Sequence, residues 1–416
     1  MKISTKDKNI IRELANKQFE YANSPINKER INEWYEHNDL KGKRPMIHLE
    51  MGTFYSEIIP PRLCCVSEQA RGIEARLYSN FVNHELFNDD YPVPDFFPVY
   101  WDAYIKILGI DIEVEYIKDE SGNNTIAHQF KHEINDLKRD MHKLKKSPYG
   151  VDRGRVMEYK TTLEELFGDI LPVKIVSASP AAFPTCDLVM LMGMENMFLT
   201  MYDYPDEFHE VMGRITNDYI EFFRWQEKEG LILPTNGNNV VHWGTWGFTH
   251  ELKGTKDGEP CSLKQTWGYM NSQESVGLSP DMYHQFVFPY YKKIADLFGL
   301  FAYGCCEAVH PFWEKSLSNL TNLRKLSISH WTDEHYMGEQ LKNSKVIYQR
   351  KPFPNYISTR NSFDESGFTS DIVNTLKAAK DCKVEFILRD IYTINSDIDR
   401  ARRVVEIIRE QIGNLW

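Results

Sequence analysis

Short apolar runs alternate with longer amphipathic stretches along most of this chain. We interpret the apolar runs as strands, and they span residues 45–51, 111–117, 172–178, 238–244, 299–306, 323–330, 345–350 and 384–390. A repeated strand followed by a longer helix is the pattern of βαβ units. Eight strands separated by helices can close a barrel. The pattern therefore predicts an α/β fold, a (β/α)₈ TIM barrel.

Three later segments carry the helical pattern clearly. Residues 206–230 have apolar side chains at three- and four-residue spacing, and residues 397–412 form a final amphipathic stretch. Between them, Ser279-Pro280-Asp281 predicts an N-cap with proline in the first turn, which opens a helix as far as about Phe298.

The first 45 residues are expected to be helical. Ile10, Ile11, Leu14 and Phe19 follow a helical spacing among polar residues. We therefore expect an N-terminal helical extension over residues 1–45, followed by a single barrel over residues 46–416.

Composition and charge narrow the class of protein. The 416 residues are 42% hydrophobic and 13% aromatic, which supplies a large core. The net charge of −11 argues against a partner that is a nucleic acid or an anionic membrane, but it allows a small anionic substrate. No apolar run is long enough to span a membrane, and the polar amino terminus lacks the apolar region of a signal peptide. We expect a cytoplasmic protein.

Cysteine usage agrees with that compartment. There are seven cysteines, an odd number, and four of them form the adjacent pairs Cys64–Cys65 and Cys305–Cys306. Adjacent cysteines rarely bridge one another because the geometry is strained. Reduced thiols are therefore expected rather than a disulfide framework.

Reactive side chains gather where the predicted strands end. In a barrel, chemistry takes place at the carboxyl ends of the strands. The four segments at such ends that are rich in polar or reactive residues are 304–307, 330–333, 350–354 and 389–393.

Several motifs follow one another in an order that resembles a known superfamily. They are Gly193-Met194-Glu195, Tyr204-Pro205-Asp206, the Phe-x-x-Pro-Tyr element at 286–290, YGCCE at 303–307, IYQRKPFP at 347–354 and LRDIYT at 388–393. Together they resemble the uroporphyrinogen decarboxylase-like superfamily, from about residue 170 to the end. That superfamily includes the porphyrinogen decarboxylase and the methyltransferases that move methyl groups between corrinoid proteins and thiol or folate acceptors. The first 170 residues lack the arginine-bearing segment that holds substrate carboxylates in the decarboxylase, which counts against a porphyrinogen substrate.

The run from Cys305 to His310 contains three kinds of zinc ligand. We consider Cys305, Cys306, Glu307 and His310 as metal ligands, because thiolate, carboxylate and imidazole groups all bind zinc. The resemblance implies zinc held by a His-x-Cys pair and by a cysteine of the last strand. Here Cys305 matches the first cysteine, but Tyr303 stands in place of the histidine.

The last strand ends in Arg389-Asp390 instead of a cysteine, so the ligand set implied by the resemblance is incomplete. A substitute set could include His330. The alternative is that the cysteines are buried small apolar residues. If the strand stays extended, Tyr303, Cys305 and Glu307 face one side and Cys306 faces the helices.

Four residues are candidates for catalysis, namely Tyr303, Glu307, His330 and Asp390. His330 with Trp331 could line an aromatic pocket, and Asp333 could cap the helix that follows.

Three cations are candidate clamps for a carboxylate or phosphate, namely Arg350, Lys351 and Arg389. Alternation along the strand means that only one of Arg350 and Lys351 points inward. Arg389 with Asp390 could instead be an internal ion pair.

Another candidate for binding a flat ligand is the tryptophan- and glycine-rich segment 242–248. His242, Trp243 and Trp246 offer stacking surfaces, and Gln273 could project into the same mouth. The alternative is that these side chains pack within the loop and bind no ligand. The turn at 88–91 could hold a metal, cap an element or simply be solvated.

The leading hypothesis is methyl transfer with a corrinoid protein or another methyl carrier. Zinc and a corrinoid carried by a partner are its candidate cofactors, and no nucleotide is expected because no phosphate-binding glycine loop is present. The alternative is a metal-free decarboxylase of a tetrapyrrole-like or small carboxylic acid. A third hypothesis is a non-catalytic binding subunit of a methyltransferase complex. A small-molecule substrate is expected, and a homodimer remains open.

Overall fold

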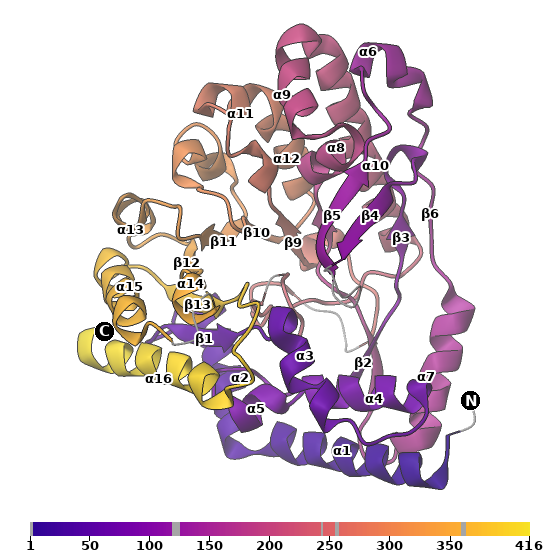
Figure 1. Cartoon of the computed structure of the whole chain (residues 1–416), viewed down its shortest axis with the longest axis vertical. Coiled ribbons are helices and arrows are strands. Elements are labelled where there is room, and N and C mark those ends of the chain that lie inside the picture. The colour runs from indigo at the N-terminus through magenta and orange to yellow at the C-terminus, as the bar shows by residue number, and fades with distance from the viewer. Residues whose placement is uncertain (1–2, 119–124, 243, 254–257, 359–362) are drawn as a thin grey trace.

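A seven-stranded parallel sheet forms the frame of the protein (Figure 1). The computed structural model describes residues 3–118, 125–242, 244–253, 258–358 and 363–416. In order across the sheet, the strands are β1 (Met46–Leu49), β13 (Val384–Leu388), β12 (Ile347–Arg350), β11 (Leu323–Ile328), β10 (Leu300–Tyr303), β9 (Trp267–Met270) and β8 (Ala181–Ala182). All but β8 are buried along their whole length, as is usual for a parallel sheet covered on both faces.

Helices connect these strands and cover the outside of the sheet. They are α8 (Pro184–Met192), α9 (Met194–Asp203), α10 (Pro205–Lys228), α11 (Pro280–Phe286), α12 (Phe288–Ala295), α13 (Glu334–Leu341), α14 (Asn355–Ser358), α15 (Glu365–Ala378) and α16 (Ile398–Leu415). The helices predicted at 206–230 and 397–412 are confirmed as α10 and α16. The one predicted to begin at Pro280 is confirmed, but it is interrupted at Val287 and continues as α12.

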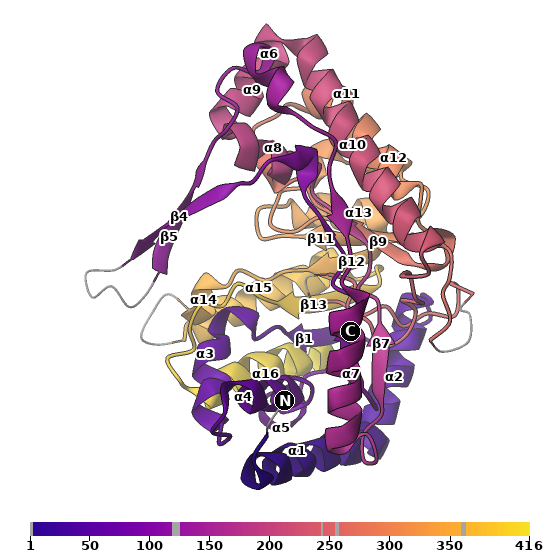
Figure 2. The same ribbon diagram turned by 90° about the vertical axis from the view of Figure 1, so that its right-hand side faces the viewer.

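The first part of the chain adds helices beneath the sheet and strands beside it, together with α6, which lies beside α9 at the other end of the molecule (Figures 1 and 2). The helices are α1 (Thr5–Asn23), α2 (Pro25–Asn38), α3 (Tyr55–Ile58), α4 (Glu68–Ser79), α5 (Val82–Leu86), α6 (Leu137–Asp140) and α7 (Arg153–Phe167). The strands are β2 (Phe97–Tyr100), β3 (Tyr104–Ile105), β4 (Glu113–Lys118), β5 (Thr125–Lys131), β6 (Tyr149–Gly150) and β7 (Val173–Val176). None of the helices in the described ranges is long and apolar enough to cross a membrane.

The arrangement is that of a TIM-barrel-like α/β fold in which strand pairing does not close the ring. β2 pairs in parallel with β7, and four residues separate β7 from β8. Across the described strands, no pairing joins β2 to β1. Instead, Asp89 and Asp90 each accept a backbone N–H of β1, from Leu49 and Ile47 respectively, at 2.8 Å. The turn at 88–91 is therefore a buried cap on the open edge of β1.

Three of the predicted strands do not belong to the seven-stranded sheet. Residues 172–178 contain β7, which pairs with β2. The described residues of the predicted strand 238–244 form a loop in which Val240 bridges Trp246. This loop enters the barrel, where Val241 packs against β9 and β10. Residues 111–117 overlap β4, which pairs only with β5 in a hairpin that projects from the body (Figure 2). Two strands that were not predicted, β2 and β9, take the corresponding positions: β9 lies between β8 and β10, and β2 pairs with β7.

The amino end of the barrel is sealed by a buried polar cluster beneath α2. The Lys325 Nζ lies 2.8 Å from Glu385 Oε2, and His37 Nε2 of α2 lies 3.2 Å from the same oxygen. Thr245 and Gln349 donate to the other Glu385 oxygen at 2.7 and 2.6 Å. Burial lowers the pKa of Lys325. Although burial alone would raise the pKa of Glu385, Lys325 and His37 hold it well below its ordinary value.

Asp90→Asn is expected to lower the free energy of unfolding by about 2 kcal/mol, because a neutral amide binds guanidinium groups weakly. Arg44 and Arg409 each lie 2.8 Å from the buried Asp90 carboxylate. Chemical denaturation followed by circular dichroism measures the change. The exposed Asp95 gives the control, since Asp95→Asn should change stability by less than about 0.5 kcal/mol. Equal effects of the two substitutions would contradict the capping role of Asp90.

Candidate functional site

The carboxyl ends of β9 to β13 meet at one end of the sheet, which we call the barrel mouth. Lys351, directly after β12, is buried there and donates to the carbonyl oxygen of Cys305 at 3.2 Å. Its neighbour Arg350 points to the opposite face and pairs with Glu334 and Asp371 at 2.8 and 2.9 Å. The prediction that only one of these two cations points inward is confirmed, and that cation is Lys351.

Cys305 and Cys306 form a pair of neighbouring thiols at the mouth. Their sulfur atoms are 3.4 Å apart, and the Cys306 sulfur also lies 3.5 Å from Asp390 Oδ2. The single thiol proton of Cys306 can be donated to only one of these partners at a time. The Cys306 hydrogen bond, together with the charges of Lys351 and Arg389, lowers the pKa of Cys305 to about 7 against the opposing effect of burial. The same hydrogen bond raises the pKa of Cys306. Cys305 is therefore the thiol of this pair that ionises at neutral pH.

Glu307 fixes the loop that carries these thiols. Its buried carboxylate accepts the backbone N–H of Cys305 at 2.7 Å and that of Ser272 at 2.9 Å. Burial raises the pKa of Glu307 despite these hydrogen bonds. The carboxylate thus ties the end of β10 to the end of β9 and sets the backbone position of Cys305.

His242 and Arg389 complete the inner part of the mouth. His242 stacks on Phe183 and meets Tyr269 edge-on, with ring centroids 5.6 and 4.9 Å apart. Burial, together with the charges of Arg389 and Lys351, lowers the pKa of His242 to about 4, so the imidazole is neutral at pH 7. Arg389 Nε lies 3.2 Å from Asp390 and 3.6 Å from Glu50.

A cavity of about 590 Å³ opens beside the thiol pair. It is lined by His128, Phe130, Cys186, Val189, Met190, Met194, Gln273, Glu274, Val276, Cys306, Glu307, Ala308 and Trp331. These residues come from the β5 strand, from α8 and α9, and from the loops after β9, β10 and β11. The predicted residues Gln273, Cys306 and Glu307 thus share one cavity, which we call the mouth cavity.

Several residues in or next to the lining of the mouth cavity were missed by the sequence analysis. Cys186 and Asp187 lie in the first turn of α8, and Thr185 donates to the buried Glu274 at 2.8 Å. Burial raises the pKa of Asp187 to about 7, although Tyr219 donates to it at 2.8 Å. The signal that could have identified them is the proline-opened helix Pro184-Thr-Cys-Asp directly after a strand end.

Tyr303 lies outside the mouth. It is fully buried under the helices, and its hydroxyl group is 2.8 Å from that of Tyr283 on α11. Ala302 faces the barrel interior, so its neighbour Tyr303 faces outward. Gly304 then takes a φ of +97°, which ends the alternation and brings both cysteines to the mouth. The strand is thus not extended beyond Tyr303, so the condition under which Tyr303 and Cys305 would share a face is not met.

Two other predicted residues, Trp246 and His330, lie apart from the thiols. Trp246 packs against Trp34, Met46 and Phe248 at the amino end. His330 sits between the rings of Trp331 and Phe353 at the end of β11, with centroids 4.4 and 4.3 Å away. Trp243 lies outside the described residues.

The proposed zinc ligands do not form a coordination set. His310 accepts the backbone N–H of Asp333 at 3.1 Å, and Glu307 binds two backbone N–H groups. Asp333 caps α13, as the sequence allowed. Over the described ranges, no three histidine, cysteine, aspartate or glutamate side chains are grouped so that they could hold a metal ion. These residues do not fit zinc, and we derive no step through it.

No protein-family model matches the chain, and no curated protein is significantly similar to it in sequence. Among solved structures, the chain is similar to a methyltransferase from Methanosarcina mazei, with a TM-score of 0.51. Sequence identity is 11%, and the match covers 92% of this chain and 98% of that protein. The chain therefore has a methyltransferase-like α/β fold.

Proposed function

We propose that this protein is a methyltransferase whose reactive centre is the thiol pair at the barrel mouth. The observation that carries the proposal is the pair of adjacent thiols at the mouth, with sulfur atoms 3.4 Å apart and Lys351 bound to the Cys305 backbone at 3.2 Å. The Cys306 hydrogen bond and the charges of Lys351 and Arg389 lower the pKa of Cys305 to about 7. A thiolate at neutral pH is a good base and nucleophile. The fold shared with a methyltransferase, and the motifs in the second half of the chain, support the same class.

The chemistry that we propose is activation of a small methyl acceptor in the mouth cavity. The Cys305 thiolate takes the proton of the acceptor's nucleophilic group, directly or through the Cys306 thiol. The electron pair left on the acceptor forms the bond to the methyl carbon, and the bond between methyl group and donor breaks with its electron pair left on the donor. Lys351 and Arg389 stabilise the negative charge on the acceptor.

The methyl carrier that we propose is a corrinoid protein. A corrinoid supplies, when bound, a methyl group that a nucleophile can remove. Met194, Val276 and Trp331 line the mouth cavity and are 47%, 56% and 66% exposed. Such apolar side chains at an open rim suit contact with the face of a large macrocycle.

A methyl-transfer assay tests the proposal. Free methylcobalamin serves as the donor and a panel of small thiols as acceptors, with the methyl thioether detected by mass spectrometry. The wild-type protein should form the product, and Cys305→Ser should lower the rate by at least about a hundredfold. Cys64→Ser, at an exposed cysteine far from the mouth, is the control. Absence of transfer with this donor would count against corrinoid-linked transfer, and release of CO₂ from a carboxylic acid would favour the metal-free decarboxylase.

Alkylation of Cys305 by iodoacetamide should rise with pH around a midpoint near 7, because its pKa is lowered to about 7. For an ordinary thiol, the midpoint of the alkylation rate against pH lies at about 8.5. Mass spectrometry of the Cys305 peptide measures the rate at each pH. Lys351→Met should move the midpoint upward, since it removes a charge that stabilises the thiolate. A midpoint of about 9 in the wild-type protein would contradict an activated thiol.

A further inference from the structure

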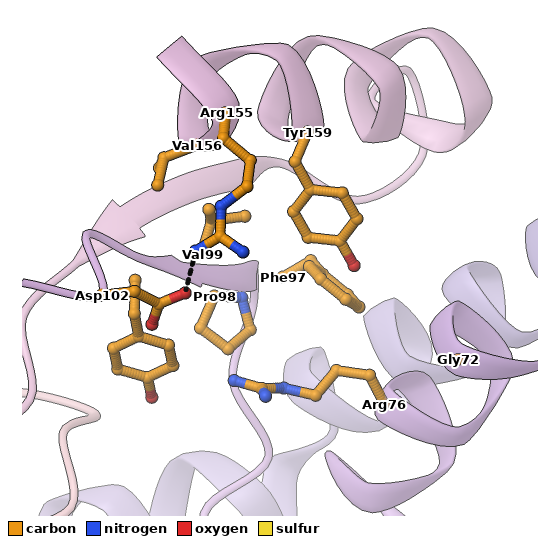
Figure 3. A pocket seen from close by; sticks show the side chains of 10 residues that line it. Gly72, Arg76, Phe97, Pro98, Val99, Asp102, Arg155, Val156 and Tyr159 are labelled. Carbon is orange, nitrogen blue, oxygen red and sulfur yellow. Dashed lines mark ion pairs between the residues drawn. The ribbon is translucent and has the colours of Figure 1, made fainter. Parts of the chain in front are cut away.

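A separate cavity lies between α4, β2 and α7, and none of its lining residues belongs to the mouth (Figure 3). Its volume is about 420 Å³. The lining residues are Gly72, Arg76, Phe97, Pro98, Val99, Tyr100, Asp102, Arg155, Val156 and Tyr159. We call it the arginine cavity, because Arg76 enters it from α4 and Arg155 enters it from α7 (Figure 3).

The arginine cavity carries more positive than negative charge. No ion pair of Arg76 is found among the described residues; its guanidinium is 5.4 Å from the centre of the Tyr100 ring and is hydrogen-bonded to the Tyr100 side chain. Arg155 Nη2 is 3.8 Å from Asp102 Oδ2, and both side chains are about two-thirds exposed, at 69% and 65%. An ion pair so long and so exposed is weak. Two guanidinium groups therefore remain able to bind an added anion.

The walls between the two arginines are apolar. Phe97 and Val99 of β2 and Val156 of α7 line the cavity together with the rings of Pro98 and Tyr159. Figure 3 shows the Tyr159 hydroxyl group pointing into the space between the two helices. A bare inorganic ion would use the charges and leave these surfaces uncovered. A ligand with an apolar ring and one anionic group would use both.

We propose that the arginine cavity binds a small organic anion, a carboxylate or phosphate carried on an apolar ring. The planar guanidinium forks of Arg76 and Arg155 bind the oxygen atoms, since this geometry matches carboxylate and phosphate groups. The apolar walls cover the ring. This site is independent of the proposed methyl transfer, because it shares no residue with the mouth.

Calorimetric titration with benzoate, phenyl phosphate, inorganic phosphate and benzyl alcohol tests the proposal. Benzoate and phenyl phosphate should bind, and both should bind more tightly than inorganic phosphate or benzyl alcohol. Arg76→Gln and Arg155→Gln should each weaken binding by about tenfold or more, because each removes a charge-assisted hydrogen bond. Hydrogen exchange of α4 and α7 should slow when benzoate is added, which locates the bound probe.

A neighbouring arginine on the same helix provides the matched control. Arg153 pairs with Glu229 at 3.1 Å and does not line the cavity, so Arg153→Gln should leave the affinity unchanged. Asp102→Asn should strengthen binding a few-fold, because it removes the carboxylate that competes for Arg155. The proposal is overturned if neither organic anion binds at millimolar concentration, or if Arg76→Gln and Arg155→Gln bind as the wild-type protein does. Equal affinity for inorganic phosphate and phenyl phosphate would overturn the role of the apolar walls.

Discussion

Glu385→Gln is expected to lower the free energy of unfolding by about 3–5 kcal/mol. The substitution keeps the size of the side chain but leaves the fully buried Lys325 without its counter-charge, 2.8 Å from a neutral amide. His37 loses its partner in the same step. Unfolding in guanidinium chloride, followed by circular dichroism, measures the loss.

A double variant controls for the volume and hydrogen bonding of the site. Lys325→Met combined with Glu385→Gln removes both charges, so it should recover much of the loss seen in Glu385→Gln alone. A double variant less stable than Glu385→Gln would show that Lys325 contributes mainly through packing against the rings of Trp34 and Trp267, which lie 5.5 and 5.6 Å from its nitrogen.

Glu307→Gln is expected to lower kcat for methyl transfer by about a hundredfold with a much smaller change in KM, since small displacements of reacting groups cost this much. An amide has one acceptor oxygen, so it leaves the N–H of Cys305 or that of Ser272 without a partner. The loop that carries the thiols then loses its fixed position. Initial rates at several acceptor concentrations measure both constants.

The pH dependence of Cys305 alkylation gives the second readout for Glu307→Gln. A shift of the midpoint would show that Glu307 positions the thiol. Glu314→Gln, at an exposed glutamate later in the same loop, should change neither kcat nor the midpoint. Equal losses of activity in the two variants would contradict the positioning role of Glu307.

Most of the sheet could be predicted from the sequence because its strands are short, rich in apolar residues and separated by helices. β10 to β13 fall within the predicted runs, and β1 falls within 45–51. β2 and β9 were missed because each has only four residues and contains proline or glycine, which weaken a strand pattern. Residues 238–244 have a strand-like composition, but the described part of this segment is a loop inside the barrel.

The site was predicted in outline, and the errors have local causes. The cysteines, Glu307, Lys351 and Arg389 do meet at the barrel mouth, because parallel strands bring their carboxyl ends together. Tyr303 was predicted to be a site residue because side chains alternate along an extended strand. Gly304, which follows it, takes a positive φ and ends this alternation before Cys305. Ion pairs between different elements, such as that of Arg350 in β12 with Asp371 in α15, cannot be predicted from a local sequence pattern.

The buried polar cluster of His37, Lys325 and Glu385 has a consequence for the order of folding. α2 is among the first segments to be synthesised, yet its contacts are made with the last strands: Arg324 donates to the carbonyl oxygen of Asn38, 286 residues earlier. The contact of His37 with Glu385 and that of Trp34 with Lys325 can therefore form only after nearly the whole chain has been synthesised. Contacts so distant in sequence are slow to form. Packing of α2 against the amino end of the barrel is thus expected to be a late and rate-limiting step in the folding of this protein.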